Sequence, residues 1–208
     1  MKKINLLIIL ILILSLILSA CSKKNDENKD SAIVNNQTQN QEEKQDDETA
    51  NVDKESDENV MKMPSFTLKT IDGDEISSDI FGDYDLTIIS IWQSTWGPCL
   101  RELAALNVIY DEYKDKGVNV LGINVDDVET FGDEGVRKVI ETLELKFPNV
   151  VADYDYMLKL IEFVNATPTA IVVDKNGEFL LTPLVGSSGT EEDIKNFKAI
   201  IEEYKKLK

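Results

Sequence analysis

The hydrophobic and polar positions divide the chain of 208 residues into three parts. Residues 6–18 form an apolar run that only Ser15 interrupts. Residues 22–60 are polar and charged and contain no aromatic side chain, whereas from about Met61 apolar positions return with regular spacing. This last part, residues 61–208, is long enough for one domain of ordinary size.

The apolar spacing in residues 61–208 predicts alternating strands and helices. Continuous β-branched runs are typical of buried strands, and apolar residues three or four positions apart are typical of helices with one buried face. Asp72-Gly73 and Lys175-Asn176-Gly177 have the composition of hairpin turns. The expected elements are a hairpin over 63–78, strands over 85–92, 118–126, 169–174 and 178–185, helices over 98–113, 136–145, 154–164 and 191–207, and a further strand between the second and third helices.

This order of elements predicts the fold class. A strand–helix–strand unit is parallel, and the final pair of strands followed by a helix is antiparallel. We therefore expect an α/β domain with a central mixed sheet and helices on both faces. The chain has no internal repeats.

Composition and charge exclude several classes of function. The chain has 39 acidic and 22 basic side chains, a net charge of −17, and no histidine. A polyanion would be repelled, so we expect no nucleic-acid partner. Without histidine there is no histidine-based triad and no typical zinc site, and no glycine-rich phosphate loop is present. We therefore expect neither a metal nor a cofactor.

The N-terminus resembles the export signal of bacterial lipoproteins. Lys2 and Lys3 precede an apolar run that is shorter than the roughly 20 residues of a membrane span. The run ends in Leu18-Ser19-Ala20-Cys21, which resembles a lipobox, and the resemblance implies removal of residues 1–20 and lipidation of Cys21. The alternative is an uncleaved membrane helix. Both interpretations place the rest of the chain at the outer face of the cytoplasmic membrane.

Residues 21–60 are predicted to be the lipidated cysteine and a disordered acidic tether. Such a composition buries too little apolar surface to offset its chain entropy. A metal-binding acidic tail is the less favoured alternative, because the acidic residues are scattered without the geometry of a binding loop. Once Cys21 carries lipid, Cys99 is the only thiol left, so no internal disulfide can form in the chain as written.

Four features of residues 61–208 together resemble the thioredoxin superfamily, and within it the TlpA/ResA-like group of membrane-tethered, extracytoplasmic thiol-disulfide oxidoreductases. The resemblance implies a thioredoxin-like fold with an N-terminal hairpin and an inserted segment. The four features are a strand that ends at Trp92 and leads into Gly97-Pro98-Cys99 and a helix with Glu102-Leu103, the segment 145–153, Thr167-Pro168-Thr169 before a strand, and the segment 171–179.

The active-site pattern of that group, Trp-x-x-Trp-Cys-x-x-Cys, fits this chain with one departure. Without gaps, Trp92 falls on the first tryptophan, Cys99 on the second cysteine, and Trp96 on the first cysteine, which is the nucleophile. An alternative alignment puts Trp96 on the second tryptophan, but it needs two compensating length changes in a tight loop. We therefore prefer the ungapped alignment.

The chemistry of this pattern needs two reactive atoms at that spacing. Unpaired N–H groups and the macrodipole at a helix N-terminus stabilise an anion, so a nucleophile there has a low pKa. A second thiol one turn further resolves the mixed disulfide. Pro98 suits the first helical turn, where a missing N–H costs nothing.

Other site residues follow from the resemblance alone. It implies a cis bond before Pro168, with the Thr167 backbone free to pair with a substrate strand. It also places Ser90 where the group often has a buried polar residue that assists proton transfer, and serine cannot act as a carboxylate base. Glu102 is interpreted as a solvated helix residue or a capping partner rather than a base.

Trp96 leaves three functions open. In the first, position 96 is selenocysteine in the native protein, because translation tables that read UGA as Trp print selenocysteine as Trp, and a selenolate suits an attacking residue. In the second, Trp96 is genuine and the domain is a redox-inactive module that binds peptides or proteins. In the third, Cys99 alone forms an adduct that an outside thiol resolves.

The first function is the leading one. It implies disulfide-containing exported proteins as substrates, a membrane thiol protein as electron donor, membrane attachment by lipid, and a monomer.

Overall fold

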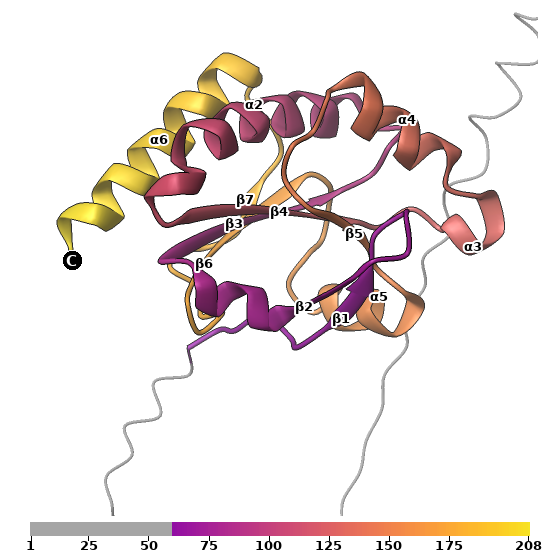
Figure 1. The fold of residues 1–208 in the computed structure, drawn as a ribbon, viewed down its shortest axis with the longest axis horizontal. Helices are drawn as coiled ribbons and strands as arrows, with labels where there is room; N and C mark the ends of the chain where they lie inside the picture. Colours follow the sequence, from indigo (N-terminus) through magenta and orange to yellow (C-terminus); the bar gives the residue numbers. More distant parts are fainter. Residues whose placement is uncertain (1–59) are drawn as a thin grey trace, which may run out of the picture. The chain divides into compact units, whose positions relative to one another are not determined.

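The computed structural model describes residues 60–208 (Figure 1). The predicted signal peptide over residues 1–20, the lipidation at Cys21 and all of the predicted tether except Val60 lie outside the described residues. Within residues 60–208, no helix combines the length and the apolar character needed to cross a bilayer.

A mixed sheet of seven strands runs through the described domain, in the order β2-β1-β5-β4-β3-β6-β7. Strand β3 lies parallel to β4 and antiparallel to β6, and β4 lies parallel to β5. The hairpin β1–β2 is joined to β5 at one edge, and β7 pairs with β6 at the other. The strands are β1 Thr67–Lys69, β2 Glu75–Ser77, β3 Leu86–Trp92, β4 Val118–Asn124, β5 Asn149–Val151, β6 Thr169–Asp174 and β7 Leu184–Val185.

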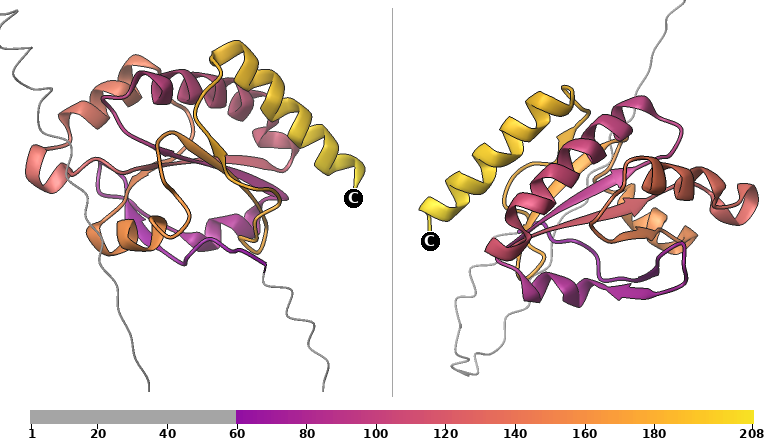
Figure 2. Two further views of the ribbon diagram at one scale, coloured as in Figure 1. Left: turned by 180° about the vertical axis from the view of Figure 1, so that it is seen from behind. Right: turned by 45° about the horizontal axis from the view of Figure 1, so that its top comes forward.

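Helices cover both faces of this sheet. Helices α2, α4 and α6 lie on one face, and α5 and η1 lie on the other (Figures 1 and 2). Helices α2 and α6 pack side by side. The helices are η1 Ser78–Asp83, α2 Gly97–Tyr113, η2 Lys114–Lys116, α3 Val128–Phe131, α4 Glu134–Thr142, α5 Tyr154–Leu160 and α6 Thr190–Lys206.

The central strands are buried on both faces, as their continuous apolar runs predict. Successive side chains of β3 alternate between two apolar cores: Ile88 packs in the core beneath α2, and Ile89 packs in the core beneath α5. The predicted α/β class, with a mixed sheet and helices on both faces, is confirmed.

The predicted strand over 178–185 is confirmed only at its end, where β7 covers Leu184–Val185, and residues 178–183 do not form a regular strand. The turn before it is present, because Gly177 has a φ of 77° and its N–H donates to Asp174 O at 3.0 Å. Beyond the turn, Glu178 and Phe179 make isolated bridges to Lys62 and Val173, and regular pairing resumes at Leu184. Pro183 lies between these two points and has no N–H to donate to a ladder.

Two predicted helices end earlier than expected. Helix α4 ends at Thr142 rather than 145, and α5 ends at Leu160 rather than 164. After α4, the side chain of Asn107 binds the turn: its amide donates to Glu144 O at 3.1 Å and its oxygen accepts from Lys146 N at 2.9 Å. A tertiary contact therefore ends this helix, which a local pattern does not reveal.

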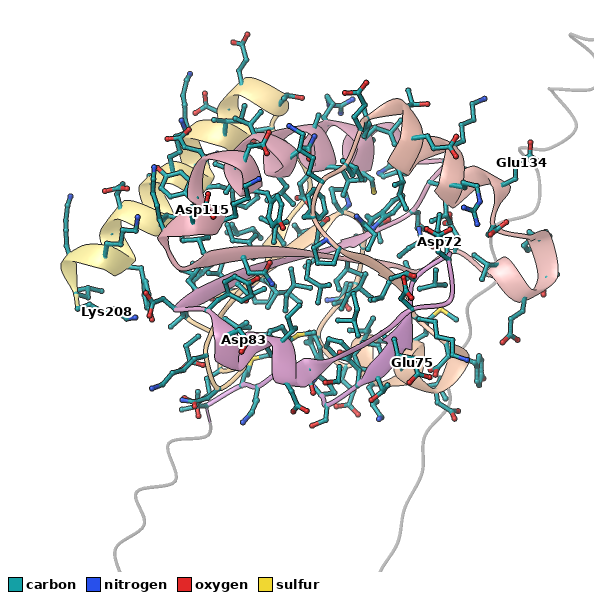
Figure 3. All side chains as sticks on the ribbon, in the orientation of Figure 1. Asp72, Glu75, Asp83, Asp115, Glu134 and Lys208 are labelled. Carbon is teal, nitrogen blue, oxygen red and sulfur yellow. The ribbon has the colours of Figure 1, made fainter. Side chains whose placement is uncertain are left out.

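Charged side chains project from the surface, among them Asp83, Asp115 and Glu134 (Figure 3). One surface ion pair links distant segments, because Arg137 of α4 lies 2.8 Å from Asp72 in the hairpin turn. Exposed pairs of this kind contribute little to stability. The two apolar cores therefore supply most of the stability.

Gly122 in β4 lets two large neighbours approach the sheet closely. A Cβ atom at this position would lie 1.9 Å from Asn149 Oδ1 and 3.0 Å from Trp92 Nε1. Both side chains are buried, so neither can move into solvent. Trp92 ends the strand that leads into the helix α2, and the absence of a side chain at Gly122 thus helps to place that junction.

We expect Gly122→Ala to destabilise the domain by about 1–3 kcal/mol, because overpacking forces buried side chains from their positions. The measurement is the free energy of unfolding in urea. Gly82→Ala is the matched control, since an added Cβ there meets nothing within 4 Å, and we expect a change within about 0.5 kcal/mol. Equal losses in the two variants would contradict this account.

Candidate active site

At the junction between β3 and α2, Trp96 is exposed to solvent and Cys99 is buried. Trp96 is the N-cap residue of α2, and Pro98 occupies the first turn. Cys99 N donates to Trp96 O at 2.9 Å, which closes that turn. Trp96 is 54% exposed, whereas Cys99 is fully buried. The structure therefore brings together the sequence-predicted residues 92 and 96–99, with the outer position at the surface and the inner position in the core.

The sulfur of Cys99 lies among groups with opposing effects on its pKa. Burial is the largest influence and raises the pKa. A hydrogen bond from the Gln93 backbone, at 3.5 Å, and the nearby polar side chain of Thr167 lower it. The negative charges of Glu102 and Asp126 raise it again. The net effect is a raised pKa, so Cys99 is a thiol at neutral pH and needs a base before it can attack.

The end of β4 holds the active-site loop in place. Asn124 Nδ2 donates to Trp92 O at 3.3 Å, and its Oδ1 accepts from Asp126 N at 3.0 Å. The carboxylate of Asp126 in turn accepts from Ser94 N at 3.0 Å. No local sequence pattern indicates the roles of Asn124 and Asp126, because they lie about 30 positions along the chain from the loop that they hold.

The predicted proline loop lies beside this junction. The Thr167-Pro168 peptide bond is cis, as the resemblance implies. Pro168 O accepts from Gly186 N at 2.8 Å, and Thr167 Oγ1 donates to Gln93 Oε1 at 2.9 Å. The register of β3 and β6 explains this proximity, because both segments are continuations of paired strands. Thr167 thus contacts the loop that carries the active-site pattern.

Glu102 is buried, so the expectation of a solvated helix residue or a cap at this position is wrong. Its side chain is 1% exposed, and Ser90 Oγ donates to its Oε1 at 2.6 Å. Burial, together with the negative charge of Asp193, raises the pKa of Glu102 to about 8, although the Ser90 bond opposes this shift. A carboxyl with this pKa, one turn from Cys99, can take a thiol proton near neutral pH.

The sequence did contain a signal for Glu102. Three positions after Cys99, it lies on the same helix face as the buried residues of α2, and the polar Ser90 stands within an apolar strand. Together, the two residues indicated a buried hydrogen-bonded pair.

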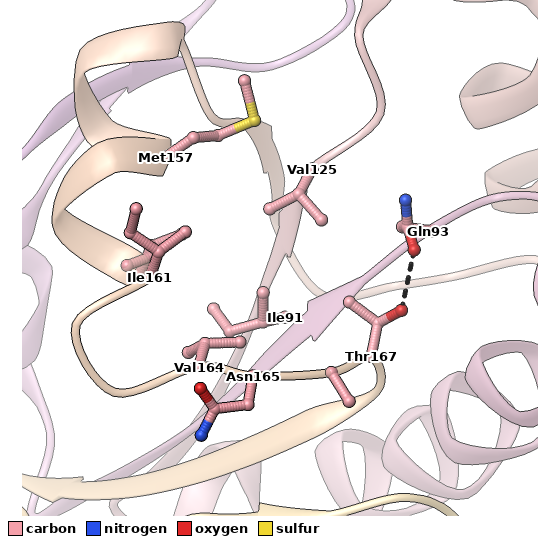
Figure 4. A pocket seen from close by; sticks show the side chains of 10 residues that line it. Ile91, Gln93, Val125, Met157, Ile161, Val164, Asn165 and Thr167 are labelled. Atoms are coloured by element: carbon pink, nitrogen blue, oxygen red, sulfur yellow. Dashed lines mark hydrogen bonds between the residues drawn. The ribbon is translucent and has the colours of Figure 1, made fainter. Parts of the chain in front are cut away.

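A mostly apolar pocket of about 260 Å³ opens next to Thr167 (Figure 4). The turn after α5 forms one wall, and the ends of β3 and β4 form the other. Gln93 and Thr167, joined by their hydrogen bond, lie together at one side of the pocket in Figure 4. A group bound there would lie next to the proline loop. Within residues 60–208, no three potential metal ligands gather in one place.

Residues 61–179 match the family model described as the AhpC/TSA family. This match covers more than half of the chain. The protein belongs to the AhpC/TSA family. The thioredoxin-like fold that the resemblance implies is thereby confirmed.

Curated relatives agree with this assignment. The chain is 33% identical over 132 residues to thiol-disulfide oxidoreductase ResA of Geobacillus kaustophilus, which covers 63% of this chain and 71% of the relative. It is 26% identical over 141 residues to ResA of Bacillus cereus, which covers 67% and 77%. The predicted membership of a ResA-like group of thiol-disulfide oxidoreductases is confirmed at the level of the family.

Solved structures show the same fold. The crystal structure of StoA from Bacillus subtilis aligns with a TM-score of 0.50 at 26% identity and covers 64% of this chain and 96% of StoA. The thioredoxin domain of a thiol-disulfide oxidoreductase from Bacteroides vulgatus aligns with a TM-score of 0.55 at 22% identity, over 68% and 96%. The second likeness supports the fold alone.

The raised pKa of Glu102 predicts how stability depends on pH. The folded state binds the Glu102 proton more tightly than the unfolded chain, where the ordinary pKa is 4.5. Its contribution to stability is therefore fully present below about pH 4.5 and is lost as pH rises to about 8. Glu102→Gln stays neutral and can still accept from Ser90. Between pH 5 and 8.5, we expect the free energy of unfolding of this variant to rise by roughly a few kcal/mol relative to that of the wild type, which is the order of magnitude that linkage gives.

The measurement is urea unfolding of both proteins across this pH range. Glu141→Gln, an exposed substitution on α4, is the control and should follow the wild type. If the curves of wild type and Glu102→Gln stay parallel, Glu102 does not titrate as described.

Proposed function

We propose that this protein is a thiol-disulfide oxidoreductase that acts on exported proteins outside the cytoplasmic membrane. Position 96 supplies the attacking atom, and Cys99 is the resolving thiol. One observation carries the proposal: the exposed residue at the start of α2 lies three positions before a buried cysteine, and Thr167 of the cis-proline loop donates to Gln93 of the loop that leads to them. The ResA relatives support the same reaction class.

Tryptophan cannot be the attacking group, so we propose that position 96 is selenocysteine in the native protein. The side chain there is exposed at a helix N-terminus, where a selenolate is stabilised. It attacks a substrate disulfide, forms a selenium–sulfur bond and releases one substrate thiolate. Cys99 then attacks selenium, which joins positions 96 and 99 and releases the second substrate thiolate.

Protons and electrons balance in this sequence. The substrate disulfide gains two electrons, and the pair at positions 96 and 99 loses them. The proton of Cys99 passes to ionised Glu102, and the released substrate thiolates take protons from water. A membrane thiol protein, the electron donor that the resemblance implies, reduces the pair again. Glu102 and its partner Ser90 are thus the proton-transfer groups of the proposal.

Two alternative functions require different properties of Trp96 and Cys99. A redox-inactive binding module would keep a genuine Trp96, whose exposed indole and the adjacent apolar pocket suit contact with a peptide. An enzyme that used Cys99 alone would need an accessible sulfur, and the full burial of Cys99 disfavours it.

Substitution at position 96 tests the roles of the two positions. Recombinant protein with Trp96 should not reduce insulin with a dithiol donor, whereas Trp96→Cys should be active, roughly tenfold or more above this background, because it restores two reactive atoms at the required spacing. Trp96→Cys combined with Cys99→Ser should accumulate the mixed disulfide, and Trp96→Ser is the control. An active Trp96 protein would contradict the assigned roles.

The mass of the native protein decides between the two leading functions. Selenium at position 96 in the tryptic peptide from the native source, with a UGA codon, would support the oxidoreductase. A tryptophan mass, with peptide binding that Cys99→Ser leaves unchanged, would support the binding module.

The lipid anchor is a separate proposal, motivated by the lipobox-like residues before Cys21. We expect Cys21→Ser to move the protein from the membrane fraction to the soluble fraction, because the lipid attachment site is lost. Ser22→Ala, which keeps Cys21, should remain in the membrane. Retention of Cys21→Ser in the membrane would favour the uncleaved helix instead.

A further inference from the structure

Two buried carboxyl groups from different helices line one cavity. The cavity has a volume of about 450 Å³ and lies between α2, α6 and the segment after β7. Its lining includes Glu102 of α2 and Asp193 and Asn196 of α6. It has room for several water molecules, at about 30 Å³ each. Val185 and Ser188, which also line it, are exposed, so the cavity opens at the surface.

Asp193 is fixed in this cavity by its own hydrogen bonds. It is 6% exposed, and its carboxylate accepts from Ser187 Oγ at 2.5 Å and from Ser188 N at 2.9 Å. Its main-chain N donates to Gly189 O at 2.9 Å, within the first turn of α6. These bonds hold the Asp193 carboxylate at one place in the cavity.

Among residues 60–208, no Lys or Arg lines the cavity that holds the two carboxyls. The groups around Glu102 are Ser90 of β3, which donates to it, Cys99 on its own helix, and Asp193 of α6. A nearby negative charge disfavours the ionisation of a buried carboxyl such as Glu102. Asp193 therefore opposes the ionisation of Glu102 across the cavity that both residues line.

We propose that Asp193 is a positioning residue for the chemistry at Cys99: its fixed carboxylate acts across the cavity on Glu102, which takes the Cys99 proton and returns it to solvent there. This inference rests on the proposed function. The proton moves from Cys99 Sγ to the Glu102 carboxylate and then to water in the cavity, on the α6 side of the helix. The repulsion from Asp193 adds to burial in raising the pKa of Glu102.

The direct measurement is the ¹³C chemical shift of the Glu102 carboxyl carbon against pH in the full chain. Asp193→Asn removes the charge, and its amide can still bond to Ser187 and Ser188. We expect the Glu102 midpoint to fall by roughly half a pH unit or more. Asn196→Asp adds a carboxylate to the same lining, and the midpoint should rise.

Glu191→Gln is the matched control, because it removes a charge from the same helical turn at an exposed position outside the cavity lining. The Glu102 midpoint should stay unchanged in this variant. Asn196 is exposed, so Asn196→Asp carries the test even if Asp193→Asn fails to fold. A midpoint that does not move in either cavity variant, or that moves equally in Glu191→Gln, would overturn the proposal.

A second readout separates this inference from the proposed function. Thiolate absorbance at Cys99 against pH, with Cys99→Ser as the blank, should change in Glu102→Gln and change in the direction of the Glu102 shift in Asp193→Asn. If only Glu102→Gln has an effect, the role of Asp193 is wrong and the proposed function stands. If neither has an effect, Glu102 is not the proton acceptor and that part of the proposed function fails.

Discussion

The burial of strand β3 on both faces is the constraint on which the remaining structure depends. All seven of its residues are buried, and it pairs with β4 on one side and β6 on the other. Because α2 follows directly, the position of this strand decides where the helix begins and which of its residues enter the core. The same strand supplies Ser90, the polar partner of Glu102. The packing of β3 in the core therefore also sets the geometry of the candidate active site.

As a consequence, positions 96 and 99 differ sharply in solvent exposure, although they are less than one helical turn apart. The outer residue meets solvent and the positive end of the helix, whereas the inner sulfur is surrounded by the core and by acidic groups. Such an environment keeps the inner thiol protonated until a base accepts its proton. In the proposed function, attack therefore begins at position 96 and resolution follows at Cys99, which is the order that thiol–disulfide exchange requires.

Glu102 links this site to the cavity between α2 and α6. Its carboxyl has Cys99 on its own helix as one neighbour and the cavity shared with Asp193 as another. A buried carboxyl with a pKa near 8 costs stability at alkaline pH, as linkage requires. Retaining such a group in a core is understandable if proton transfer needs it, since an apolar residue would pack there without this cost.

The sequence by itself determined the fold class, the order of most elements and the location of the site. Apolar periodicity marked β3 and α2, and the motif from Trp92 to Cys99 with Thr167-Pro168 indicated the family, because these signals are local and strong. Only the tertiary structure decided that Glu102 is buried, that Asp193 shares a cavity with it, and that Asn107 ends α4. These features depend on contacts between segments far apart along the chain, and a residue's solvation is set by what packs over it rather than by its neighbours in sequence.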